Sequence, residues 1–322
     1  MQRSLRQYDP PQRPVTAANT PSSRPGFTLI ELMAVILVIG ILTAIMLPAI
    51  SNVRRTARIA QVTVDIKNLE KAIADFKLKY GMEPPSSFLI SATPSDYTGS
   101  AIGKNSLAVM RQLWPNYDPS DSSVGLPGTL MGGVDGKYLN GAECLTFFLG
   151  GPGVYSSTGS ATDCSPLGFS ANPRNPFASG GTRVGPFYEF DSSRLVDTNN
   201  NGFYELIDTL PNQTTPYFYL SSYGGRGYQL RGYNNTLGDD DDEMPSSVGM
   251  TYAYFKSVSG GTPVYWNAKT FQIISPGFDN TFGTLSCYRE QKFYDTNTGK
   301  TPQSATYEKD NITNFSSGPL AP

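Results

Sequence analysis

The chain has 322 residues and a formal net charge of −2, from 25 lysines and arginines against 27 aspartates and glutamates. It contains no histidine, which excludes Ser-His-Asp and Cys-His nucleophilic catalysis, histidine-ligated zinc or haem, and a histidine pH switch. The nearly neutral charge gives no general attraction to nucleic acid, so no nucleic-acid partner is expected.

Residues 1–26 form a basic, proline-rich leader. The stretch contains four arginines and five prolines but a single acid, Asp9. A segment with so few apolar residues cannot bury enough surface to offset the entropy of folding. We therefore predict that the leader has no stable structure of its own.

Residues 27–50 are almost continuously apolar. As an α-helix they would measure roughly 36 Å, enough to cross a hydrocarbon core of about 30 Å. A cleaved secretory signal would be shorter and would end at a small-residue cleavage site. The run therefore predicts a transmembrane helix. Glu31 lies inside it, and because an acid there costs about 2.5–3.5 kcal/mol on insertion scales, its presence indicates a function.

The residues that flank Glu31 carry a family resemblance. They read Arg24-Pro25-Gly26-Phe27-Thr28-Leu29-Ile30-Glu31-Leu32. This stretch resembles the class III prepilin signal of type IV pilins and type II secretion pseudopilins. The resemblance implies that a prepilin peptidase cleaves between Gly26 and Phe27, removes the leader and methylates the new amine of Phe27. It also implies that Glu31 and Pro48 serve in assembly; a plain membrane anchor is the alternative.

The role of Glu31 also has a physical basis. Cleavage creates an ammonium group at Phe27, and an unpaired ammonium or carboxylate in lipid is costly. Two subunits at different heights can bring Glu31 of one against the Phe27 amine of the other. Both groups are then neutralised where the dielectric constant is low and the attraction is strong. We expect this pair to set the axial step of a helical fibre.

The helical pattern continues beyond the membrane, over residues 51–81. Apolar residues recur at alternating spacings of three and four: Ile59, Val62, Ile66, Leu69, Ile73, Phe76 and Tyr80. One helix from about residue 28 to residue 80 is predicted, with a stop at Gly81. Gly40 and Pro48 are expected to kink it or melt it locally. We expect the apolar seam to pack on the protein's own sheet; a free coiled coil is the alternative.

Residues 82–322 are predicted to form a globular α+β head. Short helices are expected at 107–113 and 142–149. Strand-like runs rich in aromatic and β-branched residues are 186–190, 203–210, 216–222, 251–256 and 270–275. An antiparallel sheet packed on the outer half of the long helix would bury both apolar faces. The pilin resemblance implies the same lollipop arrangement of helix and head.

A second resemblance lies near the end of the chain. Residues 274–283 read ISPGFDNTFG and are similar to the calcium-binding C-terminal loop of major secretion pseudopilins. Asp279 matches the acid of that loop, whereas Asn280 replaces its usual glycine. The resemblance implies that Asp279 is a calcium ligand.

A twelve-residue stretch from Asp197 to Asp208 has the spacing of a calcium loop. Its oxygen ligands would be Asp197, Asn199, Asn201, the Phe203 carbonyl, Glu205 and Asp208. Gly202 at loop position six permits the sharp turn that such ligands require. The alternative is an asparagine-rich hairpin turn. The acidic run Asp239–Glu243 is interpreted as a solvated loop, with a calcium site or a partner surface as alternatives.

Enzyme signatures are missing from the sequence. It contains no phosphate-binding loop, no G-x-S-x-G and no C-x-x-C. Three cysteines are too few for a disulfide scaffold; Cys144 and Cys164 could pair, and three buried thiols are an equally good interpretation. We therefore predict that the chain is not an enzyme.

The prediction from the whole sequence is a pseudopilin, a structural subunit of a type II secretion pseudopilus that drives protein export. Its expected partners are the prepilin peptidase, other pseudopilins and copies of itself, the secretion platform and the outer-membrane channel. The expected location is the inner membrane, crossed once, with the head in the periplasm. The alternatives are a type IV pilin in adhesion, motility or DNA uptake, and an enzyme or glycan-binding domain on a pilin anchor. For DNA uptake, Arg226 and Arg231 are weak candidates.

Overall fold

The computed structural model describes most of the chain after the leader. The described residues are 26–119, 121, 124–131, 133–156, 164–178, 180–228, 253–259, 262–283, 287–289, 292–294 and 308–320. By its internal contacts the chain divides into two compact units, Met1–Val53 and Arg54–Pro322. Residues 1–25 of the predicted leader, the acidic run Asp239–Glu243, and Arg231 lie outside the described residues.

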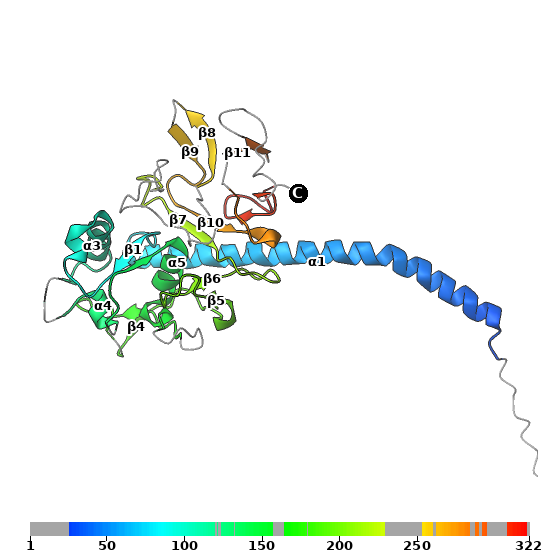
Figure 1. Cartoon of the computed structure of the whole chain (residues 1–322), viewed down its shortest axis with the longest axis horizontal. Coiled ribbons are helices and arrows are strands. Elements are labelled where there is room, and N and C mark those ends of the chain that lie inside the picture. Colours follow the sequence, from blue (N-terminus) through cyan, green and yellow to red (C-terminus); the bar gives the residue numbers. More distant parts are fainter. Residues whose placement is uncertain are drawn as a thin grey trace, which may run out of the picture. The chain divides into compact units, whose positions relative to one another are not determined.

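A single long helix, α1, runs from Leu29 to Tyr80 (Figure 1). It ends at Gly81, which has φ +78° and whose N–H donates to the Lys77 carbonyl at 2.8 Å. Glycine enters this left-handed conformation without a steric penalty, so it terminates helices well. The helix predicted over residues 28–80 is confirmed. The expected local melting is wrong, because residues 40 and 48 are both helical; one proline removes a single hydrogen bond from a very long ladder.

The first part of α1 is long and apolar enough to cross a membrane. An 18-residue window within it has a mean hydropathy of 2.7, and none of that window is buried. Apolar side chains are therefore exposed all around this part of the helix, including Ile36, Leu42 and Leu47. A helix that is apolar on every face requires a lipid or protein environment around it.

The outer part of α1 is buried along one stripe. Val62, Ile66, Leu69, Ile73 and Phe76 are buried, and Ile59 and Tyr80 are half-buried at the border of the same core. Packing of the seam against the protein's own head is thus confirmed. Its neighbours are helix α5 (Gly141–Gly150), aromatic side chains from loops, and apolar residues of short strands, among them Tyr219 and Ile273.

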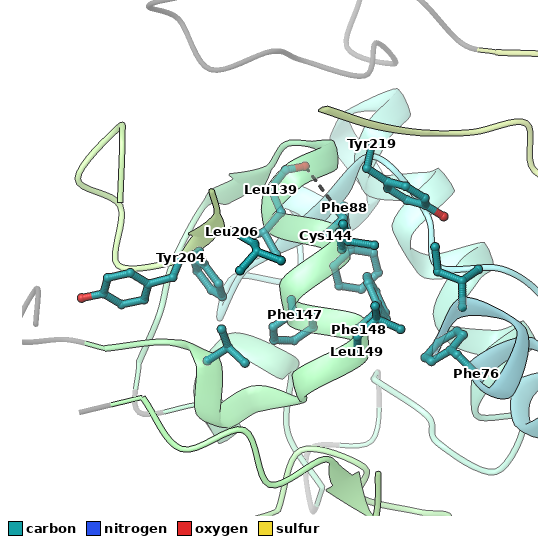
Figure 2. Close-up of a cluster of buried hydrophobic side chains, with 14 of the residues drawn as sticks. Phe76, Phe88, Leu139, Cys144, Phe147, Phe148, Leu149, Tyr204, Leu206 and Tyr219 are labelled. Carbon is teal, nitrogen blue, oxygen red and sulfur yellow. Dashed lines mark hydrogen bonds between the residues drawn. The ribbon is translucent and has the colours of Figure 1, made fainter. Parts of the chain in front are cut away.

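Aromatic rings fill the contact between α1 and α5. The ring of Phe76 meets that of Phe148 edge-on, with centroids 6.0 Å apart. Figure 2 shows Phe76 beside Phe148 and Leu149 on the inner side of α5. The ring of Tyr80 packs edge-on against Trp114, with centroids 5.9 Å apart. Edge-to-face pairs of this kind contribute about 0.5–1.5 kcal/mol each beyond the burial of their area.

One buried acid on α1 binds polar side chains from other parts of the head. Asp65 accepts hydrogen bonds from the hydroxyls of Tyr188 at 2.7 Å and Tyr217 at 2.8 Å, and it forms an ion pair with Arg194. The Arg194 guanidinium also donates to the Ile207 carbonyl at 2.7 Å. Asp65 is only 7% exposed, so these bonds replace the water that its carboxylate has lost.

The described residues contain four further α-helices and three 3-10 helices. They are α2 (Asp96–Gly99), α3 (Ala101–Leu113), α4 (Pro127–Leu130), α5, η1 (Pro152–Val154), η3 (Ser192–Arg194) and η4 (Gly277–Asp279). The helices predicted at 107–113 and 142–149 are confirmed as parts of α3 and α5. α3 begins earlier than predicted because Ser100 caps it, accepting from the Gly103 N–H at 3.0 Å.

Within the described residues the strands form five small sheets. Three are pairs: β1 (Phe88–Ile90) with β2 (Lys137–Leu139), β3 (Phe169–Ser170) with β4 (Arg183–Val184), and β5 (Leu195–Val196) with β6 (Glu205–Leu206). A three-stranded sheet has the order β13 (Ile312–Thr313), β10 (Phe271–Ser275), β7 (Phe218–Ser221). The fifth has the order β12 (Lys292–Tyr294), β11 (Cys287–Arg289), β8 (Phe255–Ser259), β9 (Thr262–Tyr265). All pairs are antiparallel except β11 with β8.

The α+β class is therefore confirmed, and the expected antiparallel pairing is present, divided among several small sheets in the described residues. The predicted runs 216–222 and 270–275 contain β7 and β10, and the run 203–210 contains only the short β6. Of the run 251–256, the first two residues are not described and the last two belong to β8. The run 186–190 is not a strand. Its aromatic residues serve α1 instead: Phe187 packs on Phe76, and Tyr188 donates to Asp65.

The three-stranded sheet lies between two apolar clusters. On β7 and just before it, Tyr217 and Tyr219 enter the cluster that contains the α1 seam, whereas Phe218 and Leu220 enter a second cluster. On β10, Ile273 and Ile274 divide in the same way. Successive side chains of a strand point to opposite faces, so a sheet with apolar residues on both faces must be covered on both sides.

We predict that Asp65→Asn strongly destabilises the head. The change leaves the Arg194 guanidinium buried without its anion, and breaking a buried pair from one side typically costs about 3–5 kcal/mol. The free energy of unfolding is measured by urea titration of the detergent-solubilised chain. Glu70→Gln is the matched control on the same helix, since the exposed Lys67–Glu70 pair should contribute less than about 1 kcal/mol. Equal, small losses in both variants would contradict the prediction.

Candidate functional site

The segment predicted to be processed lies at the start of α1. Gly26 and Phe27 precede the helix, and Phe27 is 84% exposed. Apart from its two chain neighbours, no described residue has an atom within 4 Å of a Cβ placed on Gly26. The peptide bond between Gly26 and Phe27 is therefore open to an enzyme as far as the described residues are concerned.

Glu31 is engaged in a reciprocal cap at the first turn of α1. Its Oε2 accepts hydrogen bonds from the Thr28 N–H and the Thr28 hydroxyl, both at 2.8 Å. The Glu31 N–H in turn donates to Thr28 Oγ1 at 3.3 Å. This is a capping box, which satisfies otherwise unpaired donors at a helix start. Thr28 is not among the predicted site residues, although the T-x-x-E spacing of Thr28 and Glu31 is the local signal of such a cap.

The loop predicted to bind calcium is closed by its own backbone. The Asp197 carboxylate accepts from the N–H groups of Asn201 at 3.1 Å and Gly202 at 2.8 Å. The side-chain oxygens of Asn199 and Asn201 accept from N–H groups two residues further on. Gly202 has φ +90°, the conformation for which glycine was expected here. These are the bonds of an asparagine-rich turn, the alternative interpretation of this stretch.

The last two predicted calcium ligands, Glu205 and Asp208, accept hydrogen bonds from residues outside the Asn199–Gly202 turn. Glu205 accepts from Asn140 Nδ2 at 2.9 Å and from the Thr198 N–H at 3.1 Å. Asp208 accepts from the Ser275 hydroxyl, which lies on β10, and from Gln213 Nε2 at 2.8 Å. The structure therefore brings Asp197, Asn199 and Asn201 together and places Asp208 in a separate network. The described residues contain no group of three or more histidine, cysteine or acidic side chains arranged to hold a metal ion.

An acid that sequence reasoning did not single out lies beside this loop. Glu143 Oε1 accepts from Asn199 Nδ2 at 3.0 Å and from Asn201 Nδ2 at 2.7 Å. Burial, together with the nearby Glu205 carboxyl, raises the pKa of Glu143 to about 8. Burial likewise raises the pKa of Glu205. The N-x-x-E spacing of Asn140 and Glu143 predicts a capping box, but nothing local indicates partners more than fifty residues away.

The C-terminal loop brings two acids together. Asp279 ends η4, and Asp310 accepts from the N–H groups of Phe278 at 2.6 Å and Asp279 at 3.2 Å. Burial and the Asp310 carboxylate raise the pKa of Asp279 to about 6. Asn280 has φ +60°, so it occupies the left-handed conformation in which the related loops carry glycine. Asparagine tolerates that conformation better than most residues, and the substitution does not prevent the turn.

Cys144 and Cys164 are thiols in this structure, so the candidate disulfide is not formed. The Cys144 thiol is buried and donates to the Leu139 carbonyl at 3.6 Å (Figure 2). The Cys164 thiol donates to the Val154 carbonyl at 3.7 Å. Each sulfur therefore points to a different carbonyl acceptor, and Cys144 behaves as a small apolar residue of the core.

Comparison with known proteins concerns the N-terminal part of the chain. Residues 21–47 match the family model described as the prokaryotic N-terminal methylation motif. A type IV major pilin protein, PilE1, of Neisseria gonorrhoeae is 34% identical over 79 residues, which are 24% of this chain and 48% of the pilin. The type II secretion system core protein G of Pseudomonas aeruginosa is 32% identical over 80 residues, 25% of this chain and 56% of that protein.

The similarity covers a limited part of both proteins. The chain spans about half the length of the curated relatives it matches, with shares of 48% and 56%. No solved structure matches it. The resemblance found at Gly26, Phe27 and Glu31 is confirmed, because these residues lie inside the matched motif. The N-terminal quarter of the chain is therefore type IV pilin-like: it carries the prepilin methylation motif, and its homologues include both type IV pilins and a type II secretion core protein.

Proposed function

We propose that this protein is a pseudopilin, a structural subunit of a type II secretion pseudopilus. The observation that supports it most is the segment at the start of α1, where an exposed Gly26–Phe27 bond is followed by a capped Glu31 in the otherwise apolar first part of the helix. The pairing of Asp279 with Asp310 at the C-terminal loop supports the secretion branch of the family over the pilus branch. The role is mechanical, and the chain is not an enzyme.

In this proposal the prepilin peptidase cuts after Gly26 and methylates the amine of Phe27. The apolar part of α1 stays in the inner membrane, and the head lies in the periplasm on a lollipop-like stem. While the subunit waits in lipid, the Thr28 N–H and hydroxyl satisfy the Glu31 carboxylate. On docking, Glu31 exchanges this local cap for the Phe27 amine of a neighbour, and the gain is large because both charges are then paired away from water.

The remaining partners follow from the same assembly. Copies of the chain and other pseudopilins would cover the exposed apolar surface of α1, which includes Ile36 and Leu42. The secretion platform would supply subunits from the membrane, and the outer-membrane channel would receive the exported proteins. A type IV pilin is the second candidate, favoured by the similarity to the gonococcal pilin.

Calcium at the C-terminal loop belongs to the same proposal. Two carboxyls at close range, one of them with a raised pKa, are a donor set that suits a hard divalent cation. Asp279 and Asp310 would hold the ion, and its charge would remove their mutual repulsion. The loop of Asp197, Asn199 and Asn201 is the weaker candidate, since its oxygens already accept backbone N–H groups.

Deletion of the gene tests the function directly. We expect the secretome to lose exported proteins while surface pili remain, because the fibre drives export. Mass spectrometry of the culture medium and electron microscopy of the cell surface measure the two outcomes separately. Loss of pili with an unchanged secretome would establish the type IV pilin instead. Expression of the gene in trans should restore the lost phenotype.

Replacement of Glu31 tests the assembly step. We expect Glu31→Leu to be cleaved normally but to enter fibres at least about tenfold less well, a loss of about 1.4 kcal/mol or more per docking event. Cleavage is followed by the shift in gel mobility, and incorporation by shearing and immunoblotting. The half-buried acid Glu70, changed to Gln, is the control and should assemble normally. Normal incorporation of Glu31→Leu would rule out the charge pair.

A calcium titration tests the C-terminal loop. At about a hundredfold excess over Kd, a single site stabilises a fold by about 2.7 kcal/mol, which should raise Tm by roughly 5–10 °C in a head of this size. The full chain in detergent is melted with calcium and with chelator. Asp310→Asn should abolish the shift, and Asp191→Asn, which alters an exposed acid bonded to Ser193, should not. An unchanged Tm at millimolar calcium would remove calcium from the proposal.

A further inference from the structure

Three arginines lie on α1 just beyond the apolar part of the helix. Arg54, Arg55 and Arg58 follow Ile50, the last residue of the apolar run, by four, five and eight positions. Residues three or four apart are neighbours on a helix surface, so Arg58 lies beside both Arg54 and Arg55. All three side chains are exposed. The proposed function gives none of them a role.

No neighbouring acid of α1 balances this charge. The chain has no aspartate or glutamate between Glu31 and Asp65. The ion pairs among the described residues are formed by other cations, and none of the three arginines takes part in one. Farther along the helix the charges are mixed, since residues 59–80 contain four lysines and three acids. The excess of positive charge is therefore confined to residues 54–58.

The head holds one of the three guanidinium groups without neutralising it. The Arg55 guanidinium carbon lies 4.9 Å from the centre of the Phe278 ring, a cation–π contact. Phe278 belongs to η4, part of the orange segment that Figure 1 shows against α1. Asp279, the next residue, forms no ion pair with Arg55 in the described structure. A guanidinium over a ring keeps its N–H groups at its edge, where they can bind an anion.

The distance along the helix from the apolar run matches the depth of lipid headgroups. An α-helix rises 1.5 Å per residue, so the Cα atoms of the three arginines follow the end of the run by about 6–12 Å. The polar layer on each side of a hydrocarbon core is roughly 5–8 Å thick. Helical side chains also lean toward the N-terminus of their helix, which here is the side of the apolar run. Long arginine side chains can therefore place their charges among the headgroups.

Phosphate oxygens suit these donors. A guanidinium presents its N–H groups in a planar fork that can bind two oxygens of one phosphate. Three like charges at helical spacing repel one another, and a nearby anion removes that repulsion. A zwitterionic lipid compensates less well, because it carries a cation of its own beside the phosphate. The charge and the position of the patch together favour lipids with a net negative charge.

We propose that Arg54, Arg55 and Arg58 bind the headgroups of anionic phospholipids in the leaflet from which the head emerges. The inference rests on the proposed function only in that the apolar part of α1 crosses a membrane, and a pseudopilin and a pilin would share it. The contact holds the waiting subunit at a fixed depth. A subunit that enters a fibre must give up these lipids, so the anionic lipid content of the membrane sets part of the resistance to extraction.

The lipid selectivity of the full chain in detergent micelles tests the proposal. Palmitoyl-oleoyl phosphatidylglycerol is the anionic probe, and the phosphatidylcholine with the same acyl chains is the neutral one. Native mass spectrometry measures how much of each lipid stays bound. We expect the wild type to prefer phosphatidylglycerol by about tenfold or more, because each arginine near a headgroup contributes about fivefold. Arg54→Gln combined with Arg58→Gln should remove most of that preference.

The matched control is Lys67→Gln combined with Lys71→Gln. It removes two cations from the same helix, farther from the apolar run, and should leave the preference for phosphatidylglycerol unchanged. The comparison of the two lipids on the wild type needs no variant, so the proposal stays falsifiable if a variant folds poorly. Equal binding of the two lipids by the wild type, or an unchanged preference in the arginine variant, would overturn it.

Two further outcomes would also count against lipid. Displacement of phosphatidylglycerol by millimolar inorganic phosphate would mean that the patch binds a free anion. An arginine variant that keeps its lipid preference but fails to enter fibres would mean that acids of a second copy are the partner. None of these measurements depends on the secretome or on surface pili, so this inference and the proposed function can fail separately.

Discussion

The packing of α1 into the head is the interaction on which the rest of this structure depends. The seam from Val62 to Phe76 is completely buried, so the helix forms part of the core and does not merely lie beside it. Aromatic and aliphatic contacts surround the buried seam. Asp65 fixes the position of the helix in the head, because its buried carboxylate needs the hydrogen bonds that the Tyr188 and Tyr217 hydroxyls donate. The short strands and loops of the head pack around this helix. Pairing between such short strands would not by itself give a stable fold.

Burial of acids is a second constraint, and each acid meets it in a different way. Glu31 is exposed in the isolated chain and accepts from Thr28 of its own helix turn. Asp65 has a guanidinium and two phenols. Glu143 has only amide donors, and burial first and the neighbouring Glu205 second raise its pKa. A carboxylate removed from water needs a cation, several hydrogen-bond donors or a proton.

Much of the fold was predictable where the signal is local. The limits of α1, its apolar seam, its glycine stop and the cores of α3 and α5 follow from spacing and capping within a few residues. The strands were less predictable, because the aromatic run 186–190 owes its composition to contacts with α1 and not to sheet pairing. Tyrosine and phenylalanine are favoured both in strands and in loops that pack on a helix, so their presence in the sequence does not distinguish the two.

The sequence by itself determined the N-terminal methylation motif, which includes Gly26, Phe27 and Glu31, because neighbours in the chain are also neighbours in space there. Only the tertiary structure decided which groups lie next to the other acids. Glu143 meets Asn199 across 56 positions, Asp279 meets Asp310 across 31, and Asp65 meets Tyr217 across 152. Such pairs arise when separate elements pack together, and the free energy that selects them belongs to the whole core rather than to either segment.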